Sequence, residues 1–275
     1  MKKIVALILA LVMCTFALTS CDLIDRIFGG GDSAAVSDLE KVKEAEKLVV
    51  GVTVYPPMDY VDENGEWNGF DAVLAKMFAE KLGVNCQIVI IDWNNKVAEL
   101  NSNQIDLIWN GMTASEELGE KIDFSVSYAK NAQVAVVLAD SDLTADDVKD
   151  ATVAVENGSA GEAVATDELD IHASKLVEKS DGQVSALTEV LSGNAQVAIV
   201  DITMAQSLVG KGQYADLKIL EGASYGDEIF AVGLRKGSDL KAELDSFLKE
   251  LYKEGVLTSL AEEFEVGLNT EALSN

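Results

Sequence analysis

The feature that most restricts how this chain can fold is the repeated alternation of short apolar runs with amphipathic segments. The clearest amphipathic segment places five apolar side chains on one helical face: Phe70, Leu74, Met77, Phe78 and Leu82. Apolar residues three and four positions apart are typical of a helix that packs on a core. Alternation of this kind predicts mainly parallel sheets covered by helices on both faces. Because the chain contains two such series, it predicts two α/β lobes.

The boundaries of the predicted elements follow from the apolar runs and from the residues that flank them. Strands are expected at 48–54, 87–91, 105–109, 132–138, 152–155, 176–177, 197–200, 217–220 and 228–234. Helices are expected at 94–100, 184–191, 204–209, 240–252 and 257–264, besides the one that begins near Phe70. For that helix, Asp71 is a candidate N-cap and Gly83 a candidate C-terminal stop.

The first residues are typical of a targeting segment rather than of a folded domain. Lys2 and Lys3 precede an apolar run over 4–18, which is too short for a comfortable membrane span. The run ends in Leu18-Thr19-Ser20-Cys21, which resembles the lipobox of bacterial lipoproteins. The resemblance implies a signal peptide at 1–20, lipid on Cys21 and a flexible, glycine-containing tether at 21–38. The alternative is an ordinary secretory signal with a Cys that follows it by chance.

Charge and composition exclude several classes of function. The 275 residues carry a formal net charge of −26, which disfavours binding to nucleic acid or to anionic lipid. One histidine cannot supply a zinc site, and the three cysteines do not form a disulfide framework. The sequence therefore predicts no metal and no cofactor.

A series of short motifs between 48 and 266, in this order, resembles the amino-acid-type extracellular solute-binding proteins (family 3) of bacterial ABC importers. The motifs are Tyr55-Pro56-Pro57, Gly69-Phe70-Asp71, Asp92-Trp93, Gly111-Met112-Thr113, Asp123-Phe124-Ser125, Gly158-Ser159, Val197 to Asp201 and Arg235-Lys236-Gly237. The resemblance implies a two-lobe, type II periplasmic-binding-protein fold with parallel-rich sheets and a two-strand hinge. Lobe 1 would comprise 39–133 and 230–275, and 134–229 would form the hinge and lobe 2. Ligand would bind in the cleft and be enclosed when the hinge closes.

The resemblance also implies how an amino acid would be held at both charged ends. Each charge loses water on burial and therefore needs a partner. Asp201, directly after an apolar strand, is expected to accept the ligand ammonium, although a carboxylate there also suits a helix N-cap. The backbone N–H groups of Gly158 and Ser159 are expected to hold the carboxylate.

Further candidate residues would form the walls of the same cleft. Tyr55 and Trp93 stand where the family places aromatic rings that enclose the ligand side chain. Asn110, Gly111 and Thr113 follow a predicted strand whose end should face the cleft. Gly111 permits close approach to the backbone, and Thr113 supplies a hydroxyl.

One departure from the family pattern concerns the ligand carboxylate. After Gly-Met-Thr the family usually has an Arg that clamps the carboxylate, and this chain has Leu118 at that position. Lys121 lies three residues further on and is a candidate replacement. Two ligand classes therefore stay open, which are an ordinary amino acid and an amine without a carboxylate.

Taken as a family member, the chain is expected to be the lipid-anchored receptor of an ABC importer rather than an enzyme. Its partners would be an amino acid or related small amine, the permease of the importer and, through its lipid, the membrane. The protein itself would be a monomer on the extracytoplasmic face of the bacterial cell membrane. The enzymatic alternative is a cyclohexadienyl-dehydratase-like protein. That reaction needs an acid/base carboxylate, for which Glu117 is the candidate, and an anion clamp that Leu118 does not provide.

Overall fold

The computed structural model describes residues 37–275. The predicted signal peptide, the candidate lipidation site Cys21 and residues 21–36 of the predicted tether lie outside this range. Within the described range, no helix has the length and apolarity needed to cross a membrane.

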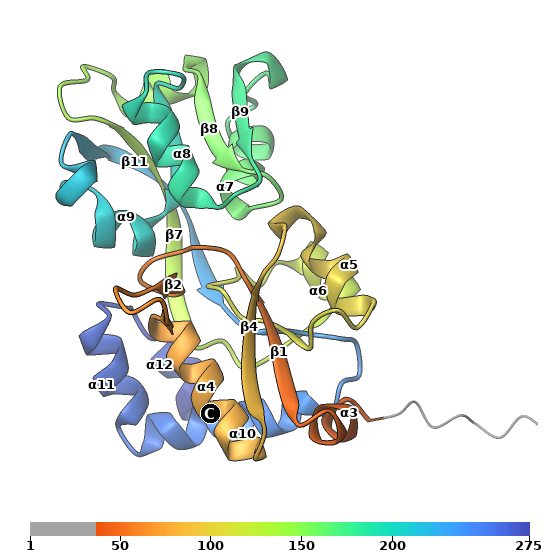
Figure 1. The fold of residues 1–275 in the computed structure, drawn as a ribbon. Coiled ribbons are helices and arrows are strands. Elements are labelled where there is room, and N and C mark those ends of the chain that lie inside the picture. Colours follow the sequence, from red (N-terminus) through yellow and green to blue (C-terminus); the bar gives the residue numbers. More distant parts are fainter. Residues whose placement is uncertain (1–36) are drawn as a thin grey trace, which may run out of the picture. The chain divides into compact units, whose positions relative to one another are not determined.

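The first lobe is built on a five-stranded mixed sheet in the order β4-β1-β5-β12-β6 (Figure 1). Its strands are β1 (Lys47–Val52), β4 (Asn85–Ile90), β5 (Leu107–Ile108), β6 (Asp123–Phe124) and β12 (Gly233–Leu234). β4, β1 and β5 run parallel, whereas β12 lies antiparallel to both β5 and β6. The antiparallel pairs arise because β12 belongs to a segment that returns from the other lobe.

Helices surround the sheet of the first lobe, and a short hairpin lies beside them. The helices are α3 (Asp38–Glu44), α4 (Phe70–Leu82), α5 (Lys96–Asn101), α6 (Glu116–Lys121), α10 (Leu240–Lys253), α11 (Val256–Glu263) and α12 (Thr270–Ser274). The hairpin pairs β2 (Tyr60–Val61) with β3 (Trp67–Asn68). Phe70, Leu74 and Phe78 of α4 are buried in one core with the β1 side chains, so the apolar face predicted for this helix is confirmed.

The second lobe repeats the arrangement with the sheet order β11-β7-β10-β8-β9. Its strands are β7 (Ala129–Leu138), β8 (Val153–Glu156), β9 (Leu176–Lys179), β10 (Val197–Asp201) and β11 (Leu217–Phe230). Its helices are α7 (Ala160–Ala163), α8 (Gln183–Leu191) and α9 (Ile202–Leu208). β9, β8 and β10 are parallel, β7 lies antiparallel to β10, and the edge strand β11 lies antiparallel to β7.

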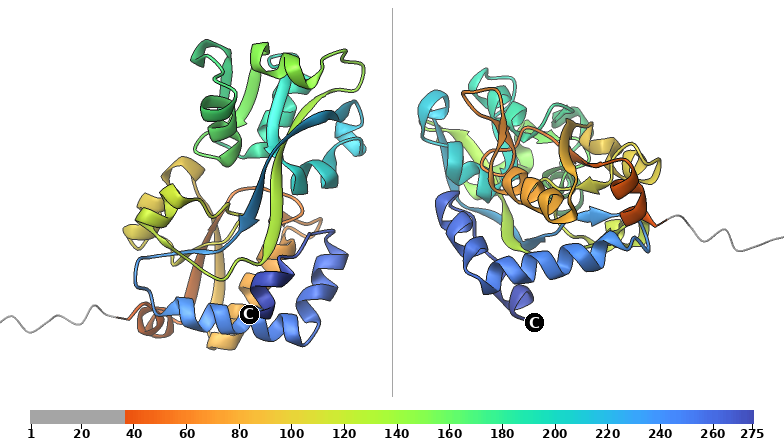
Figure 2. Two further views of the ribbon diagram at one scale, coloured as in Figure 1. Left: turned by 180° about the vertical axis from the view of Figure 1, so that it is seen from behind. Right: turned by 60° about the horizontal axis from the view of Figure 1, so that its bottom comes forward.

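β7 and β11 are the two strands that run between the lobes (Figures 1 and 2). They pair antiparallel from Ala129 opposite Phe230 to Leu138 opposite Leu217, with two irregularities in register. At the end that lies in the first lobe, Phe230 forms a bridge with Thr113, and Ala129 forms one with Leu268. The lobes are therefore joined by one two-stranded ribbon.

The two ends of α4 test the predicted cap residues. Gly83 adopts the left-handed conformation at the C-terminus, as predicted. The prediction that Asp71 is the N-cap is wrong, because the helix begins at Phe70 after Gly69 and Asp71 lies in its first turn. The buried Asp71 carboxylate instead accepts hydrogen bonds from the Gly111 N–H (2.6 Å) and the Tyr128 hydroxyl (2.8 Å). A tertiary contact therefore uses the side chain that the local pattern assigned to a cap.

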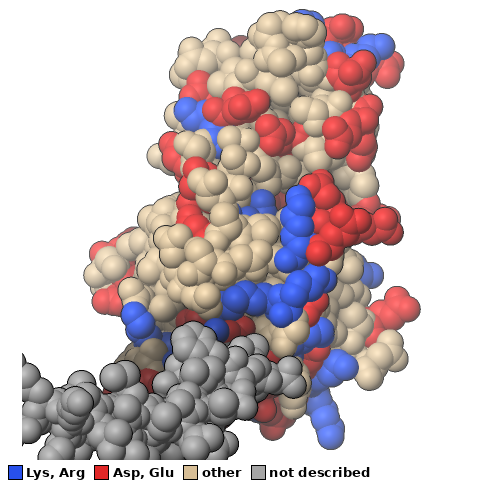
Figure 3. All heavy atoms as spheres, turned by 90° about the vertical axis from the view of Figure 1, so that its right-hand side faces the viewer, with Lys and Arg blue, Asp and Glu red and all other residues tan. Residues whose placement is uncertain are grey.

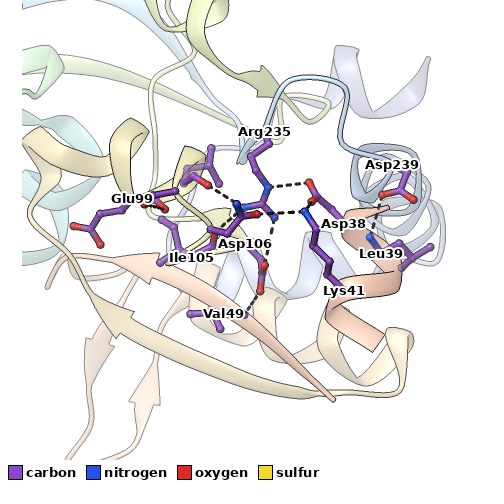
Figure 4. Close-up of polar contacts among 12 residues, drawn as sticks. Asp38, Leu39, Lys41, Val49, Glu99, Ile105, Asp106, Arg235 and Asp239 are labelled. Atoms are coloured by element: carbon purple, nitrogen blue, oxygen red, sulfur yellow. Dashed lines mark hydrogen bonds and ion pairs between the residues drawn. The ribbon is translucent and has the colours of Figure 1, made fainter. Parts of the chain in front are cut away.

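Arg235 fastens the first described helix to the sheet of the first lobe (Figure 4). Its guanidinium donates to Asp38 (2.9 Å) and Asp106 (3.3 Å), and to the carbonyl oxygens of Leu100 (2.9 Å) and Ile105 (2.7 Å). Burial alone would raise the pKa of Asp38, but hydrogen bonds led by the one from Arg235 outweigh burial and lower it. The planar guanidinium reaches all four acceptors at once, which an ammonium group cannot do.

We predict that Arg235→Lys lowers the free energy of unfolding by about 2 kcal/mol, because it leaves buried acceptors without donors. For a domain of this size, that corresponds to a fall in Tm of roughly 4–8 °C. Lys236→Met is the matched control. The neighbouring Lys236 side chain is half-exposed, pairs with Asp123 and donates to the Gly119 carbonyl, and it should contribute less than about 1 kcal/mol. Thermal unfolding followed by circular dichroism gives the comparison, and equal Tm values for the two variants would contradict the role of Arg235.

Candidate functional site

A cavity of about 760 Å³ lies between the two lobes, a size typical of sites for small molecules. Side chains of both lobes line it, together with Glu228 of the connecting ribbon. All eight residues that the sequence singled out for ligand binding are among its lining: Tyr55, Trp93, Asn110, Gly111, Thr113, Gly158, Ser159 and Asp201. The structure therefore brings these residues, up to 146 positions apart in the chain, to one place.

The aromatic wall depends on a glycine. Tyr55 follows β1 and packs edge-to-face on Phe230, with ring centroids 6.5 Å apart. Gly111 adopts φ +52°, and a Cβ there would lie 2.4 Å from Cε1 of Tyr55. A larger residue at 111 would therefore displace the tyrosine ring. Trp93 also lines the cavity, and it lies in the short helical turn Trp93–Asn95 directly before α5.

Asn110 lines the cavity, but its amide is engaged within the first lobe. Its side-chain oxygen accepts from the Thr53 N–H (2.9 Å) and hydroxyl (2.8 Å). Its amide nitrogen donates to the Thr53 carbonyl (3.1 Å) and to Asp59 (2.7 Å). These bonds tie the end of β1 to the end of β5, so Asn110 shapes the floor of the cavity.

Asp201 lies at the end of β10 and is 3% exposed. It occupies the N-cap position of α9, yet its side chain makes no capping hydrogen bond. Its carboxylate instead accepts hydrogen bonds from three side-chain amides, those of Asn131, Gln133 and Gln183. Burial, followed by the nearby Glu228 carboxylate, raises the pKa of Asp201 to about 7, although the amides oppose this rise. The alternative interpretation of Asp201 as a cap is therefore not supported by its contacts.

Glu228 is a second carboxylate beside Asp201 that sequence reasoning missed. It lies on β11 and accepts from the Thr113 hydroxyl (3.0 Å), Asn131 (2.8 Å) and Gln133 (2.9 Å). The Gln133 amide thus contacts both carboxylates, at 2.6 Å from Asp201. The available signal was the pair of polar residues Asn131 and Gln133, which point the same way two positions apart in β7.

The loop between β8 and α7 uses its own polar groups internally. The Gly158 N–H donates to Glu162 (2.7 Å), and the Ser159 N–H donates to the Glu156 carbonyl (3.2 Å). The Ser159 hydroxyl caps α7 by accepting from the Glu162 N–H (3.1 Å). Both N–H groups predicted to hold a carboxylate therefore already have acceptors in this structure.

Lys96 and Glu156 are two buried ionisable residues of the cavity that the sequence did not single out. Lys96 is 5% exposed, its Nζ lies 4.7 Å from the centroid of the Trp93 ring, and it donates to the Gly158 carbonyl across the cleft (2.8 Å). Glu156 is 2% exposed, and in the described part of the chain its Oε1 has no hydrogen-bond partner. Burial, followed by repulsion from Asp201, raises the pKa of Glu156 to about 8. Nothing in the local sequence distinguishes Lys96 from a solvent-exposed lysine on a short helix.

The cavity is strongly acidic. Its described lining includes seven carboxylates: Glu117, Glu156, Glu162, Asp167, Glu168, Asp201 and Glu228. Only two cationic side chains, Lys96 and Lys121, are among the same described lining residues. Acidic side chains are also spread over both lobes of the face in Figure 3, where Lys and Arg gather mainly in the lower half. This balance favours a ligand that carries at least one positive charge.

The residues around the missing arginine also lie at the cavity. Leu118 lines it from α6, which begins after the Ser115 cap. Lys121, the candidate replacement, is a lining residue too, but its side chain is 49% exposed and pairs with Glu117 at 2.7 Å. Across residues 37–275, no cluster of His, Cys, Asp and Glu is suited to hold a metal ion.

Comparison with known proteins agrees with this geometry. Residues 48–266 match the model of the bacterial extracellular solute-binding proteins, family 3. The L-cystine-binding protein TcyJ of Escherichia coli is 30% identical over 82% of this chain and 85% of its own length. The arginine-binding extracellular protein ArtP of Bacillus subtilis is 29% identical over 97% of this chain and 99% of its own.

Solved structures give the same result for the fold. A mutant of ArgBP from T. maritima is 34% identical, with a TM-score of 0.76 over 83% of this chain and 99% of that one. A histidine-bound substrate-binding protein of an ABC uptake transporter from Streptococcus pneumoniae is 30% identical, with a TM-score of 0.75 over 84% and 97% of the two chains. The predicted type II fold is confirmed, and the relatives are binding proteins of ABC transporters rather than enzymes.

We predict that Gly158→Ala weakens closure of the lobes. A Cβ at this position would lie 2.9 Å from Cα of Asn94 on the opposite lobe, and Gly158 has φ +74°. The affinity for ligand should fall roughly tenfold, which corresponds to about 1.4 kcal/mol. Gly193→Ala is the matched control, since Gly193 has φ +76° and a Cβ there would have no atom within 4 Å. Calorimetric titration with the best ligand of an amino-acid screen makes the comparison, and equal losses in both variants would assign the effect to backbone strain alone.

Proposed function

Because the chain belongs to family 3 of the bacterial extracellular solute-binding proteins, we propose that it is the lipid-anchored receptor of an ABC importer for an amino acid. The observation that carries this proposal is the Asp201 carboxylate, which is buried at the cavity and oriented by three amides. A buried carboxylate with a raised pKa is costly, and a ligand ammonium is the partner that offsets this cost.

The proposed binding mode assigns each part of the ligand to a described feature of the cavity. The ammonium lies at Asp201, with Glu228 close enough to add to the attraction. The ligand side chain packs between the rings of Tyr55 and Trp93. Because the ammonium favours the charged form of Asp201, binding should lower the pKa of this residue from about 7.

Two observations narrow the range of possible ligands. Relatives are named for binding arginine and L-cystine, and one similar solved structure has histidine bound. The acidic lining of this cavity suits ligands with additional nitrogen groups. The second candidate is an amine without a carboxylate. It is favoured by Leu118 at the usual arginine position and by the occupied N–H groups of Gly158 and Ser159.

The same proposal includes hinge closure and membrane attachment. Lobe 1 (39–133 and 230–275) and lobe 2 (134–229) would rotate relative to each other about β7 and β11. The hydrogen bond from Lys96 to the Gly158 carbonyl would form on closure. The segment 1–20 would be removed as a signal peptide, and 21–38 would tether the lobes to lipid on Cys21. The partner is then the permease of the importer, and the receptor works as a monomer on the extracytoplasmic face of the bacterial cell membrane.

Asp201→Asn tests the function directly, after a thermal-shift screen of residues 37–275 against amino acids and amines. The amide keeps the shape of the carboxylate but cannot neutralise an ammonium, so affinity should fall at least a hundredfold, about 2.7 kcal/mol. The Tm of the protein without ligand should change by only a few degrees at pH 7, because removal of a buried charge offsets the loss of one acceptor oxygen for the three amides.

Asp167→Asn is the control for this experiment, since it removes the same charge from an exposed residue at the rim of the cavity. It should change affinity less than threefold. An Asp201→Asn protein that binds as the wild type does would refute the proposed ammonium site. Absence of any stabilising amino acid or amine in the screen would refute the receptor function itself.

The lipid anchor has its own test in Cys21→Ala. Without the thiol, no diacylglyceryl group can be attached, so the variant should no longer incorporate labelled palmitate and should stay uncleaved or leave the membrane fraction. Metabolic labelling and fractionation of a host expressing the full chain give the result. Equal labelling of the variant and the unmutated protein would contradict lipid attachment at Cys21. Absence of label from the unmutated protein would point to the alternative, an ordinary secretory signal with a Cys that follows it by chance.

A further inference from the structure

Lys96 is a buried ammonium group without a carboxylate partner. Its Nζ donates to two carbonyl oxygens, those of Trp93 (3.1 Å) and Gly158 (2.8 Å). Within residues 37–275, no ion pair involves Lys96, although seven carboxylates line the same cavity. Buried charges in proteins are normally paired, so this position suits an anion from outside the chain.

We infer that Lys96 binds the carboxylate of the amino-acid ligand and so supplies the cation that Leu118 does not. This inference rests on the proposed function, because it names the residue that holds the second charged end of the same ligand. It decides between the two ligand classes in favour of one that carries a carboxylate.

The other candidate groups for this role are already engaged. Lys121 is half-exposed and paired with Glu117. The N–H groups of Gly158 and Ser159 donate to acceptors of their own loop. Of the cationic side chains in the described lining, Lys96 is therefore the one that is both buried and free of an acidic partner.

The geometry around Lys96 suits this role. An ammonium has three N–H donors, and two are used for carbonyl oxygens, which leaves one for a ligand. Nζ also lies 4.7 Å from the centroid of the Trp93 ring, which belongs to the aromatic wall. A ligand that packs on this ring therefore has the Lys96 ammonium within reach, and the bond to Gly158 holds that ammonium between the lobes.

The electrostatic surroundings of Lys96 are consistent with binding of a carboxylate that belongs to the ligand. Burial lowers the pKa of Lys96 to about 8, although Glu156 on β8, Glu117 on α6 and Glu162 on α7 oppose this change and Lys121 adds to it. A bound carboxylate would raise this pKa again, because an opposite charge favours the ammonium form. Ligand binding near pH 8 should therefore take up a proton at Lys96.

The decisive experiment compares an amino acid with its own carboxamide, which keeps the ammonium and the side chain. The amino acid is the best one from the thermal-shift screen. Lys96→Met, which retains the apolar stem of the side chain, should weaken binding of the amino acid by roughly 10- to 100-fold and change binding of the carboxamide less than about threefold. Lys121→Met is the matched control, since it removes the other lining lysine, and it should leave the ratio of the two affinities as in the wild type.

A second measurement removes the Lys96 cation and introduces a cation at position 118 instead. In the Lys96→Met, Leu118→Arg double variant, the guanidinium at the family position should recover preference for the amino acid over its carboxamide. Equal loss of both ligands in Lys96→Met, or a double variant that regains no preference, would overturn the inference. These outcomes differ from failure of the proposed function, in which neither ligand binds the wild type.

Proton uptake gives a test on the unmutated protein, which holds even if Lys96→Met folds poorly. The amine of the free carboxamide has a pKa of about 8 and takes up a proton of its own on binding at this pH, so that uptake, known from a titration of the free carboxamide, is subtracted first. Calorimetric titration at pH 8, in buffers with different ionisation enthalpies, should then show uptake of about half a proton more for the amino acid than for the corrected carboxamide. Below pH 7 the excess should vanish, because Lys96 is already charged there. An excess of zero at pH 8 would contradict contact between Lys96 and the carboxylate.

Discussion

The pairing of β7 with β11 is the interaction on which the rest of this structure depends. The two strands join the lobes, and they also carry the polar side chains Asn131, Gln133 and Glu228 that surround Asp201. Gln133 donates to both Asp201 and Glu228. A rearrangement of the ribbon would therefore move the same side chains that hold the Asp201 carboxylate. If ligand binds at Asp201 and the lobes move about β7 and β11, as proposed, binding and hinge geometry are coupled through residues in direct contact.

The cavity is built at a cost in stability. Asp201 and Glu156 are buried with pKa values raised to about 7 and about 8. Their folded-state values exceed those of the unfolded chain, so the stability they contribute is present at acid pH and is lost as the pH rises through these values. Lys96 adds a buried cation whose pKa is lowered. A ligand with its ammonium at Asp201 and its carboxylate at Lys96 would relieve the penalties at these two residues together, which is a physical reason for the site to favour a zwitterion.

The sequence allowed the fold class and eight residues of the cavity lining to be predicted, because they follow from strand ends and ordered motifs. It did not reveal Lys96, Glu156 or Glu228 as site residues, since their importance arises from contacts with segments distant in the chain. Glu228 meets Thr113 across 115 positions, and Lys96 meets Gly158 across 62. The error at Asp71 has the same origin, because a partner 40 residues away at Gly111 competes with local capping.

The attachment of α3 through Arg235 has a mechanical consequence. Asp38 begins the first described helix, and both α3 and the C-terminal α12 belong to the first lobe (Figure 1). A pulling force applied at residue 37 would be borne by the Arg235 cluster and the parallel strands beneath it. The second lobe, connected by β7 and β11 alone, would carry none of this load. The proposed opening and closing of the lobes would therefore be the same with and without tension at the N-terminal end.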